Sequence, residues 1–428
     1  MTAITRRGFV GLTALAIAGA ATGCGRQSKT EGGASGSAAP AIAEGKATGS
    51  LAVWAMGAEG EKLPALIKDF TAANPDCKVT VTPIPWDSAH DKFTSAIAGG
   101  TTPDLAQVGS TWMGEFVGLG ALDQVPGNID NAKFFEGAQK TNVVDGATYG
   151  VPWYVETRCV YYRKDLATKA GITETPTDWD GLKALAKAYK EKAGAKVGLN
   201  LQPGGQGAWQ TYAPMMWSNG GKLMSEDVKT FTLDDPKNVE ALTYYQSYFT
   251  EGLANKAISS SPAEADFANG VAPMFISGPW MMAAVEKAGG GDAFKDKYGV
   301  FTMPKKESSA SFVGGANLGV FKNTKNRDAA WKLVQFLTEK ETQLKWYKSS
   351  TDLPSVKDAW EDPSLKSDEK LSVFGEQLKT AYAPPSIGTW EQVAGKMDAQ
   401  VEKVCKSGLA PAEALKTAQS EATSIGIG

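Results

Sequence analysis

The sequence predicts an α/β fold with a mostly parallel sheet, on the strength of three observations. Patterns typical of strands alternate with patterns typical of helices along most of the chain. Hydrophobic residues make up 42 % and charged residues 21 % of the chain, the proportions of a soluble globular protein. The 428 residues suffice for two or three units, each large enough to bury a core.

The alternation is clearest in the first half. An apolar run at 51–54 predicts a strand, and the polar segment 56–61 predicts a turn. Apolar residues at every third or fourth position predict a helix over 63–70, and Asn74-Pro75-Asp76 ends it. Next come an alternating strand at 78–82, a helix at 86–97 ended by Gly99-Gly100, and a strand at 103–108.

Capping signals mark the later helices. Thr177-Asp178 precedes one helix, and Asp234-Asp235-Pro236 opens another with an acid at the cap and proline in the first turn. Residues 326–347 form a helical stretch, and 411–422 a small alanine-rich helix. We expect the indoles inside the first strand and on two helix faces to be core residues: Trp54, Trp179 and Trp331.

Composition argues against several classes of function. The net charge is −3, which favours neither nucleic acid nor an acidic membrane surface as a partner. The only histidine, His90, excludes sites built on several histidines, and we expect it at the surface or half-buried. The sequence has no phosphate-binding loop or dinucleotide fingerprint, so we expect no bound nucleotide. We accordingly expect no metal and no cofactor. In contrast, 12 Trp, 12 Tyr and 16 Phe equip the chain to hold a ligand.

The N-terminus has the pattern of an export signal. Arg6-Arg7 and the apolar run after them, within residues 1–23, resemble a twin-arginine signal. Small residues before Cys24 resemble a lipoprotein cleavage site; the alternative is a plain secretory signal with a chance cysteine. Residues 24–49 read as a flexible tether with a reach of roughly 25–30 Å. We therefore expect an extracytoplasmic protein anchored to the cell membrane by a lipid on Cys24.

The other cysteines show no metal-ligand spacing. Sequence alone leaves open whether any two of Cys77, Cys159 and Cys405 form a disulfide.

Candidate binding residues cluster where elements begin or end, because open α/β sheets bind ligands outside the carboxyl ends of their strands. Six segments there pair an aromatic residue or glycine-exposed backbone with a short polar group. They are the turn with Glu59; 109–112 with Thr111 and Trp112; 151–158 with Trp153, Glu156 and Arg158; 204–209 and 217–221 with Gln206 and Trp209; 274–280 with Trp280; and 312–317 with Gly314, Gly315 and Asn317.

These residue types match the chemistry of a sugar ring. The apolar C–H face of a pyranose lies on an indole, and its hydroxyls pair with amide, carboxylate or Arg groups. Glycine lets the backbone approach closely. The same residues also build cores, so both interpretations stay open for any single Trp. Trp280 favours binding, because it follows Gly-Pro at the end of an apolar run.

The sequence gives little support for an enzyme. Glycoside hydrolysis needs two carboxylates flanking the bond. Capping explains Asp234 and Asp235, and Asp87 and Asp91 lie on one helix face. Glu59 is left without a second carboxylate, so we predict no enzymatic activity, with a secreted carbohydrate-active enzyme as an alternative.

Several short motifs occur in an order and spacing specific to one family. They are FTAANP at 70–75, IPWD at 84–87, TTPD at 101–104, YGVP at 149–152, YYRKDL at 161–166, DFANG at 266–270, MFISGPW at 274–280, and FVGG at 312–315 with Asn317. From about residue 51 to 422 the chain therefore resembles the extracellular solute-binding proteins of bacterial ABC importers. The resemblance is to the sugar-taking branch, which includes maltose/trehalose-type receptors.

The resemblance implies a two-lobe periplasmic-binding-protein fold of type II, with hinge crossings near 156–158, 312–314 and 352–354. The lobes would be residues 50–157 plus 313–353 and residues 158–312 plus 354–428, with the ligand in the cleft between them. The resemblance also implies which residues contact the ligand. An acid after the first strand corresponds to Glu59, a polar–Trp pair after the third strand to Thr111 and Trp112, and an acid and Arg at the first crossing to Glu156 and Arg158. Trp280 corresponds to an indole that stacks on the sugar, and Gly314 and Gly315 to a Gly-Gly pair that contacts it through the backbone.

The implied function is a monomeric receptor that captures a mono- or oligosaccharide by hinge closure and delivers it to a membrane permease. Ser110 stands where the family often has an acid, so the identity of the sugar stays open. The alternative is a non-sugar solute such as glycerol-phosphate, a polyamine or a peptide. A phosphate would want several Arg or Lys at the cleft, and only Arg158 is a candidate there.

Overall fold

The computed structural model describes residues 39–257 and 261–428. The predicted signal at 1–23, the predicted lipidation site Cys24 and most of the predicted tether lie outside the described residues. Residues 39–48, which we expected to belong to the tether, lie against the folded domain. Ile42 and Ala47 are buried there, and the Ile42 amide donates to Asn128.

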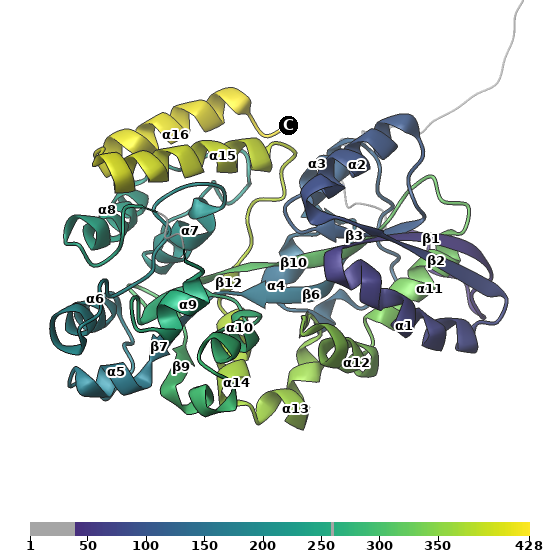
Figure 1. Cartoon of the computed structure of the whole chain (residues 1–428). Coiled ribbons are helices and arrows are strands. Elements are labelled where there is room, and N and C mark those ends of the chain that lie inside the picture. Colours follow the sequence, from purple (N-terminus) through teal and green to yellow (C-terminus); the bar gives the residue numbers. More distant parts are fainter. Residues whose placement is uncertain (1–38, 258–260) are drawn as a thin grey trace, which may run out of the picture. The chain divides into compact units, whose positions relative to one another are not determined.

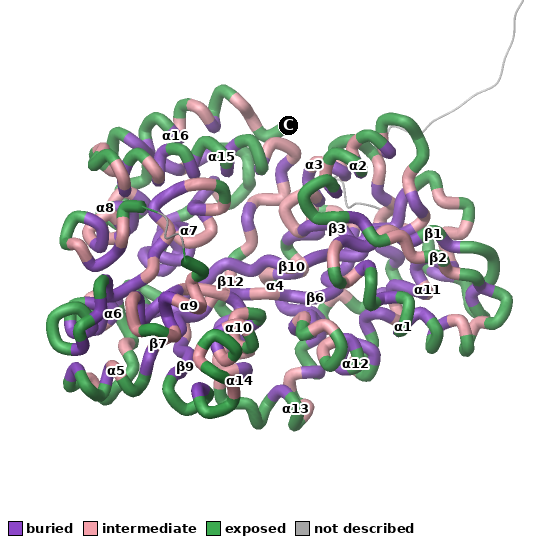
Figure 2. Tube along the Cα trace, viewed as in Figure 1, coloured by how far each residue is buried: buried purple, intermediate pink, exposed green. Residues whose placement is uncertain are grey.

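The larger sheet has seven strands in the order β11-β6-β10-β3-β1-β2, with β12 paired to β10 (Figure 1). Figure 2 shows β3, β6 and β10 buried along most of their length. The strands are β1 (Gly49–Met56), β2 (Cys77–Ile84), β3 (Leu105–Gly109), β6 (Val151–Thr157), β10 (Ser311–Val320), β11 (Leu353–Pro354) and β12 (Ala381–Tyr382).

Helices cover both faces of this sheet because side chains alternate along its strands. Leu51 and Val53 of β1 face a core packed by α1 (Gly57–Ala73), α11 (Arg327–Leu337) and α12 (Lys340–Ser350). Trp54 and Met56 face the opposite core, packed by α2 (Trp86–Gly99) and α3 (Met113–Gly118).

The smaller sheet has the order β8-β7-β9 and is wholly antiparallel. Its strands are β7 (Cys159–Arg163), β8 (Met274–Ser277) and β9 (Tyr298–Phe301). One core on this sheet includes α6 (Trp179–Ala188), α7 (Ala208–Ser218), α8 (Pro236–Thr250), α15 (Trp390–Glu402) and α16 (Pro411–Ile425). Another includes α4 (Glu136–Lys140), α9 (Ala263–Ala268), α10 (Met281–Ala288), α13 (Pro363–Lys366) and α14 (Glu369–Leu378). Further elements are α5 (Lys164–Lys169) and the β4–β5 hairpin (Val143–Val144, Ala147–Thr148).

The order of strands and helices agrees with the prediction, but the predicted mostly parallel sheet is wrong. Among the named strands of the described part of the chain, only β1–β2, β1–β3 and β10–β12 pair with each other in parallel, whereas β10 runs antiparallel to β3 and β6. Strands β6 and β10 extend toward the smaller sheet, so the chain leaves on β6 and returns on β10 in the opposite direction (Figure 1).

Most predicted helices are confirmed, with two differences. The predicted polar turn at 56–61 is the first turn of α1, which begins at Gly57. The predicted helix at 326–347 is two helices, α11 and α12, with the break at Thr338. The hydroxyl of Thr338 donates to backbone carbonyls, and its backbone carbonyl accepts from Lys133. The predicted caps hold: Asp178 accepts from Gly181 N, and Asp235 from Lys237 N.

The structure also shows the burial of the three indoles predicted to be core residues and the state of the cysteines. Trp179 and Trp331 are buried, and Trp54 packs half-buried against the α2 core. Cys77, Cys159 and Cys405 are all buried free thiols. None of the helices in the described part of the chain combines the length and apolar character needed to cross a bilayer.

Candidate functional site

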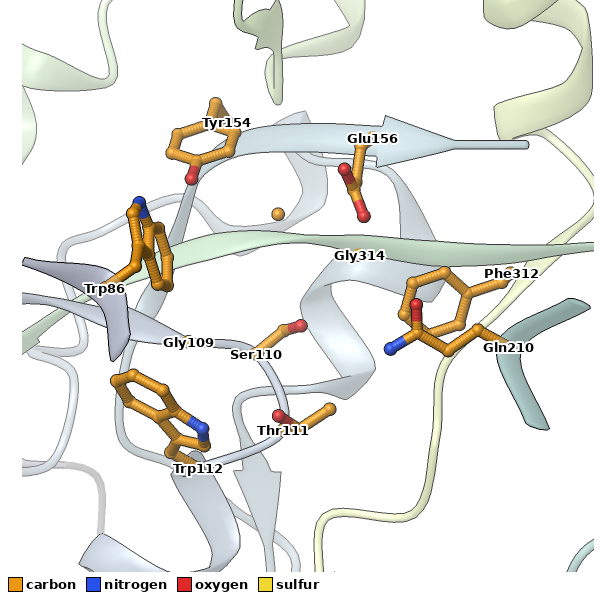
Figure 3. Close-up of a pocket in the computed structure, with 11 residues that line it drawn as sticks. Trp86, Gly109, Ser110, Thr111, Trp112, Tyr154, Glu156, Gln210, Phe312 and Gly314 are labelled. Carbon is orange, nitrogen blue, oxygen red and sulfur yellow. The ribbon is translucent and has the colours of Figure 1, made fainter. Parts of the chain in front are cut away.

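A cavity of about 230 Å³ opens at the ends of β3, β6 and β10. That volume is slightly below the roughly 300–1,000 Å³ common for small-molecule sites. Figure 3 shows Trp86 and Trp112 on one side of the cavity and Gln210 and Phe312 on the other, with Ser110, Thr111 and Glu156 between them. The lining is completed by Tyr154, Gly109, Gly314 and Gly315.

Two indoles form the first wall. Trp86 begins α2 and Trp112 precedes α3, and their rings meet edge to face with centroids 6.0 Å apart. Two glycines make room for them: a Cβ on Gly57 would lie 2.6 Å from the Trp86 ring, and one on Gly109 would lie 3.0 Å from the Trp112 ring. Trp86 remains 41 % exposed, so its ring is available to a ligand.

His90 supports this wall from behind. Its ring centroid lies 5.2 Å from that of Trp112, and Nε2 lies 2.7 Å from Glu115 Oε2. The side chain is half-buried, as predicted, and it does not line the cavity.

Tyr154, which is part of β6, lines the cavity and links β6 to α1 and β3. Its hydroxyl donates to Glu59 Oε1 at 2.9 Å and accepts from Gln107 Nε2 at 3.2 Å. Gln107, fully buried on β3, accepts in turn from the Met56 amide. Burial, and secondarily the Glu59 carboxylate, raises the pKa of Tyr154 well above its usual value, so the phenol stays protonated as a donor.

The opposite wall is built around Arg158, which follows β6. Its Nη2 donates to Glu156 Oε1 at 3.1 Å and to Gln210 Oε1 at 3.3 Å. The guanidinium carbon lies 4.6 Å from the Trp280 ring centroid and 5.9 Å from that of Phe312. One cation therefore joins β6, β10, α7 and the segment after β8.

A second carboxyl group, Asp352, lies near Glu59 without lining the cavity. Trp346 Nε1 donates to Asp352 Oδ2 at 3.0 Å. Burial, and then the charge of Glu59, raises the pKa of Asp352 to about 7. Within residues 39–257 and 261–428, no three His, Cys, Asp or Glu side chains gather as metal ligands would.

The structure brings together much of the site predicted from the sequence. Thr111, Trp112, Glu156, Gly314 and Gly315 line the cavity. Glu59 and Arg158 lie one contact behind the wall, Glu59 on Tyr154 and Arg158 on Glu156 and Gln210. Trp280 lies one contact further back, on Arg158.

Four predicted residues lie elsewhere. Trp153 is buried and stacks on Trp346 with centroids 4.7 Å apart. Trp209 is buried between Phe312 and Trp390. Asn317 is buried in a hydrogen-bonded group with Thr141 and Asn142, and Gln206 is exposed on the loop before α7.

Strand geometry explains the most instructive of these misplacements. Side chains alternate between the two sides of a regular strand, and a β-bulge interrupts that alternation. Trp153 lies at an irregularity in the β6–β10 pairing, where Ala316 pairs with Tyr154 and Asn317 with Pro152; its ring packs on Trp346, and Tyr154 lines the cavity instead.

The prediction missed six lining residues, most of which had a signal. Gly109, Ser110, Tyr154 and Phe312 lie within the six candidate segments, and Trp86 lies in the IPWD motif. Gln210 had no signal, because only folding places α7 opposite β3.

Comparisons with known proteins agree with this architecture. The family model described as bacterial extracellular solute-binding protein matches residues 55–344. A putative binding protein of Brucella abortus is 31 % identical over 366 residues, covering 84 % of this chain and 88 % of its own. The diacetylchitobiose binding protein DasA of Streptomyces coelicolor is 27 % identical, covering 96 % of this chain and 97 % of its own. The solved sugar-binding protein MalE of Xanthomonas citri superposes with a TM-score of 0.82 at 29 % identity, covering 88 % of this chain and 97 % of that one.

Proposed function

Because this chain belongs to the family of bacterial extracellular solute-binding proteins, we propose that it is a receptor that captures a mono- or oligosaccharide for an ABC importer. The observation that carries the proposal is the makeup of the cavity wall. Exposed indole surface from Trp86 and Trp112 faces a carboxylate, an amide and two hydroxyls across a small cavity. Indoles suit the C–H faces of a pyranose, and the polar groups suit its hydroxyls.

The relatives support a sugar as the ligand. DasA is named for diacetylchitobiose, a relative from Pyrococcus abyssi for maltotriose, and MalE as a sugar-binding protein. The charges in the cavity fit a neutral guest, since the lining carboxylate Glu156 is already paired with Arg158. An anionic solute would want additional cations, which disfavours glycerol-phosphate.

The mechanism is hinge closure between two lobes, residues 50–157 plus 313–353 and residues 158–312 plus 354–428. Gln210 contributes to the cavity from α7, whereas Trp86 and Trp112 contribute from α2 and the end of β3. A ligand that touches both walls binds the closed state better and shifts the population toward it.

Delivery requires the receptor to stay near the membrane. The twin-arginine pattern and Cys24 support export followed by lipid anchoring at the cell surface, with an ABC permease as the partner and a monomer as the working form. Globomycin, which blocks lipoprotein signal processing, should make the unprocessed chain accumulate, and Cys24→Ala should abolish incorporation of labelled fatty acid.

The same cavity is poorly built for hydrolysis. A glycosidase needs an acid and a second carboxylate on either side of the bond. Glu156 lines the cavity in an ion pair, Glu59 accepts from Tyr154 behind the wall, and Asp352 accepts from Trp346. We therefore propose binding without turnover.

Calorimetry tests the proposal. The purified protein is titrated with maltose, maltotriose, diacetylchitobiose, a galactooligosaccharide and, as a charged control, glycerol 3-phosphate. We expect one sugar to bind with a dissociation constant on the order of 1 μM, about −8 kcal/mol, and to be recovered unchanged. Binding of glycerol phosphate alone, or release of reducing sugar, would overturn it.

A further inference from the structure

Trp280 is exposed, yet its ring packs against two other residues. The guanidinium of Arg158 lies over one face, 4.6 Å from the centroid. The six-membered part of the ring also lies close to Gly278, where an added Cβ would be 1.8 Å from ring carbon Cζ3. Arg158 therefore occupies part of the indole surface of Trp280, which remains 41 % exposed.

Arg158 is itself held by several partners. Its Nη2 donates to both Glu156 and Gln210, and Phe312 lies 5.9 Å away on β10. The side chain is only 18 % exposed. A guanidinium between an indole and two acceptors has little freedom to turn, because cation–π contact and hydrogen bonds fix its plane together.

This arrangement sets the orientation of the Gln210 amide. Arg158 has donors and no acceptor, so it can pair only with the amide oxygen of Gln210. The amide nitrogen is thereby turned toward the middle of the cavity, on the side facing Ser110 and Thr111 (Figure 3). Gln210 thus presents two N–H donors to whatever occupies the cavity.

We propose that Trp280 is a positioning residue: it holds Arg158, and Arg158 orients Gln210 as a specificity-determining donor to a ligand oxygen. The last step rests on the proposed sugar-binding function, whereas the orientation of Gln210 exists without any ligand. The two parts can therefore be tested separately.

The ligand-free test uses NMR with ¹⁵N-labelled glutamine side chains. We expect Trp280→Ala to shift and broaden the Gln210 amide pair, and Trp280→Phe to retain most of the wild-type signal because it keeps an aromatic face. Trp86→Ala is the matched control, since Trp86 has the same 41 % exposure but does not contact Arg158. Unchanged Gln210 signals in folded Trp280→Ala would overturn the positioning role, whether or not any sugar binds.

The ligand test is a double-mutant cycle with the sugar that gives the strongest binding heat. We expect Gln210→Leu and Trp280→Ala each to raise the dissociation constant by about 3- to 10-fold. The double variant should bind about as weakly as Gln210→Leu alone, because both changes remove the same interaction. Trp86→Ala should instead combine additively with Gln210→Leu.

The result that would overturn the proposal is additivity between Trp280→Ala and Gln210→Leu, which would make Trp280 an independent contact. Urea unfolding of each variant checks that the affinity changes do not come from loss of folded protein. If no sugar binds the wild type, the proposed function fails, and the NMR result still decides the positioning role.

Discussion

Tyr154 joins three elements at the level of single atoms. Its hydroxyl connects Glu59 of α1 with Gln107 of β3, while its ring lines the cavity from β6. Because Gln107 is fully buried, the amide group that donates to this hydroxyl has no access to water. The hydrogen bonds therefore matter for stability as well as for shaping the wall.

Tyr154→Phe should lower the free energy of unfolding by about 1–3 kcal/mol, because it leaves the buried Gln107 donor without its partner. Urea unfolding at neutral pH measures the loss. Tyr149→Phe is the matched control, since the Tyr149 hydroxyl accepts from Gln124 in a half-exposed place, and it should change stability by under about 0.5 kcal/mol. Equal effects of the two changes would contradict the role of burial.

Asp352 gives the protein a pH-dependent stability. Burial and the nearby Glu59 raise its pKa to about 7, while hydrogen bonds from Ser350 and Trp346 and the charge of Lys62 oppose the shift. An unfolded Asp has a pKa of about 3.9. The folded protein therefore holds a proton that the unfolded chain releases, and the contribution of Asp352 is full below about pH 4 and lost as the pH rises through about 7.

Asp352→Asn should remove that dependence. Each pKa unit corresponds to about 1.4 kcal/mol, so between pH 4 and 8 the wild type should lose a few kcal/mol more than the variant. Urea unfolding across this range measures the difference. Parallel curves for the two proteins would show that Asp352 does not titrate as the structure indicates.

Individual elements were largely predictable because their signals are local. The caps at Asp178 and Asp235 and the apolar spacing of α1 and α2 lie within a few residues of the elements they define. The break between α11 and α12 was not predictable, because it depends partly on Lys133, about 200 residues away in the chain. The same limit applied to the site: Gln210 faces Ser110 only after the whole chain has folded.

Strand β10 offers a pair of adjacent glycines with different roles. A Cβ on Gly314 would meet the Glu156 carboxylate and the Phe312 ring, both at 2.6 Å and both parts of movable side chains. A Cβ on Gly315 would lie 2.3 Å from the backbone oxygen of Tyr154, and its φ of +116° is unfavourable for other residues. Gly314 therefore leaves room for the site, whereas Gly315 permits the strand pairing.

Gly315→Ala should accordingly cost about 2–4 kcal/mol of unfolding free energy, since neither backbone can yield without loss of pairing. Gly314→Ala should cost less stability but raise the dissociation constant for sugar, because it displaces Glu156 and Phe312. Urea unfolding and calorimetry on both variants separate the two effects. Equal stability with equal affinity in both would contradict this division.

At the scale of the whole molecule, the local sequence patterns gave a wrong prediction for the direction of strand pairing in the larger sheet. Alternating strands and helices predicted parallel pairing, yet the strands that carry the site, β6 and β10, run antiparallel to each other. Their directions are opposite because the chain leaves the larger sheet on β6, forms the smaller sheet, and returns on β10. The same path brings α7 opposite β3. The crossing on β6 and β10, which made the parallel prediction wrong, therefore also creates the cavity.

This arrangement predicts how the molecule responds to sugar. A ligand held by Trp112 on one wall and Gln210 on the other should draw the walls together, because contacts with both exist only when they are close. Small-angle X-ray scattering should therefore show a smaller radius of gyration with the binding sugar than with a non-binding sugar from the same panel. Sugar at about 100 times its dissociation constant should also raise the free energy of unfolding by about 2.7 kcal/mol. Stabilisation without any change in the radius of gyration would mean that the cavity binds as a rigid site and that hinge closure is not the mechanism.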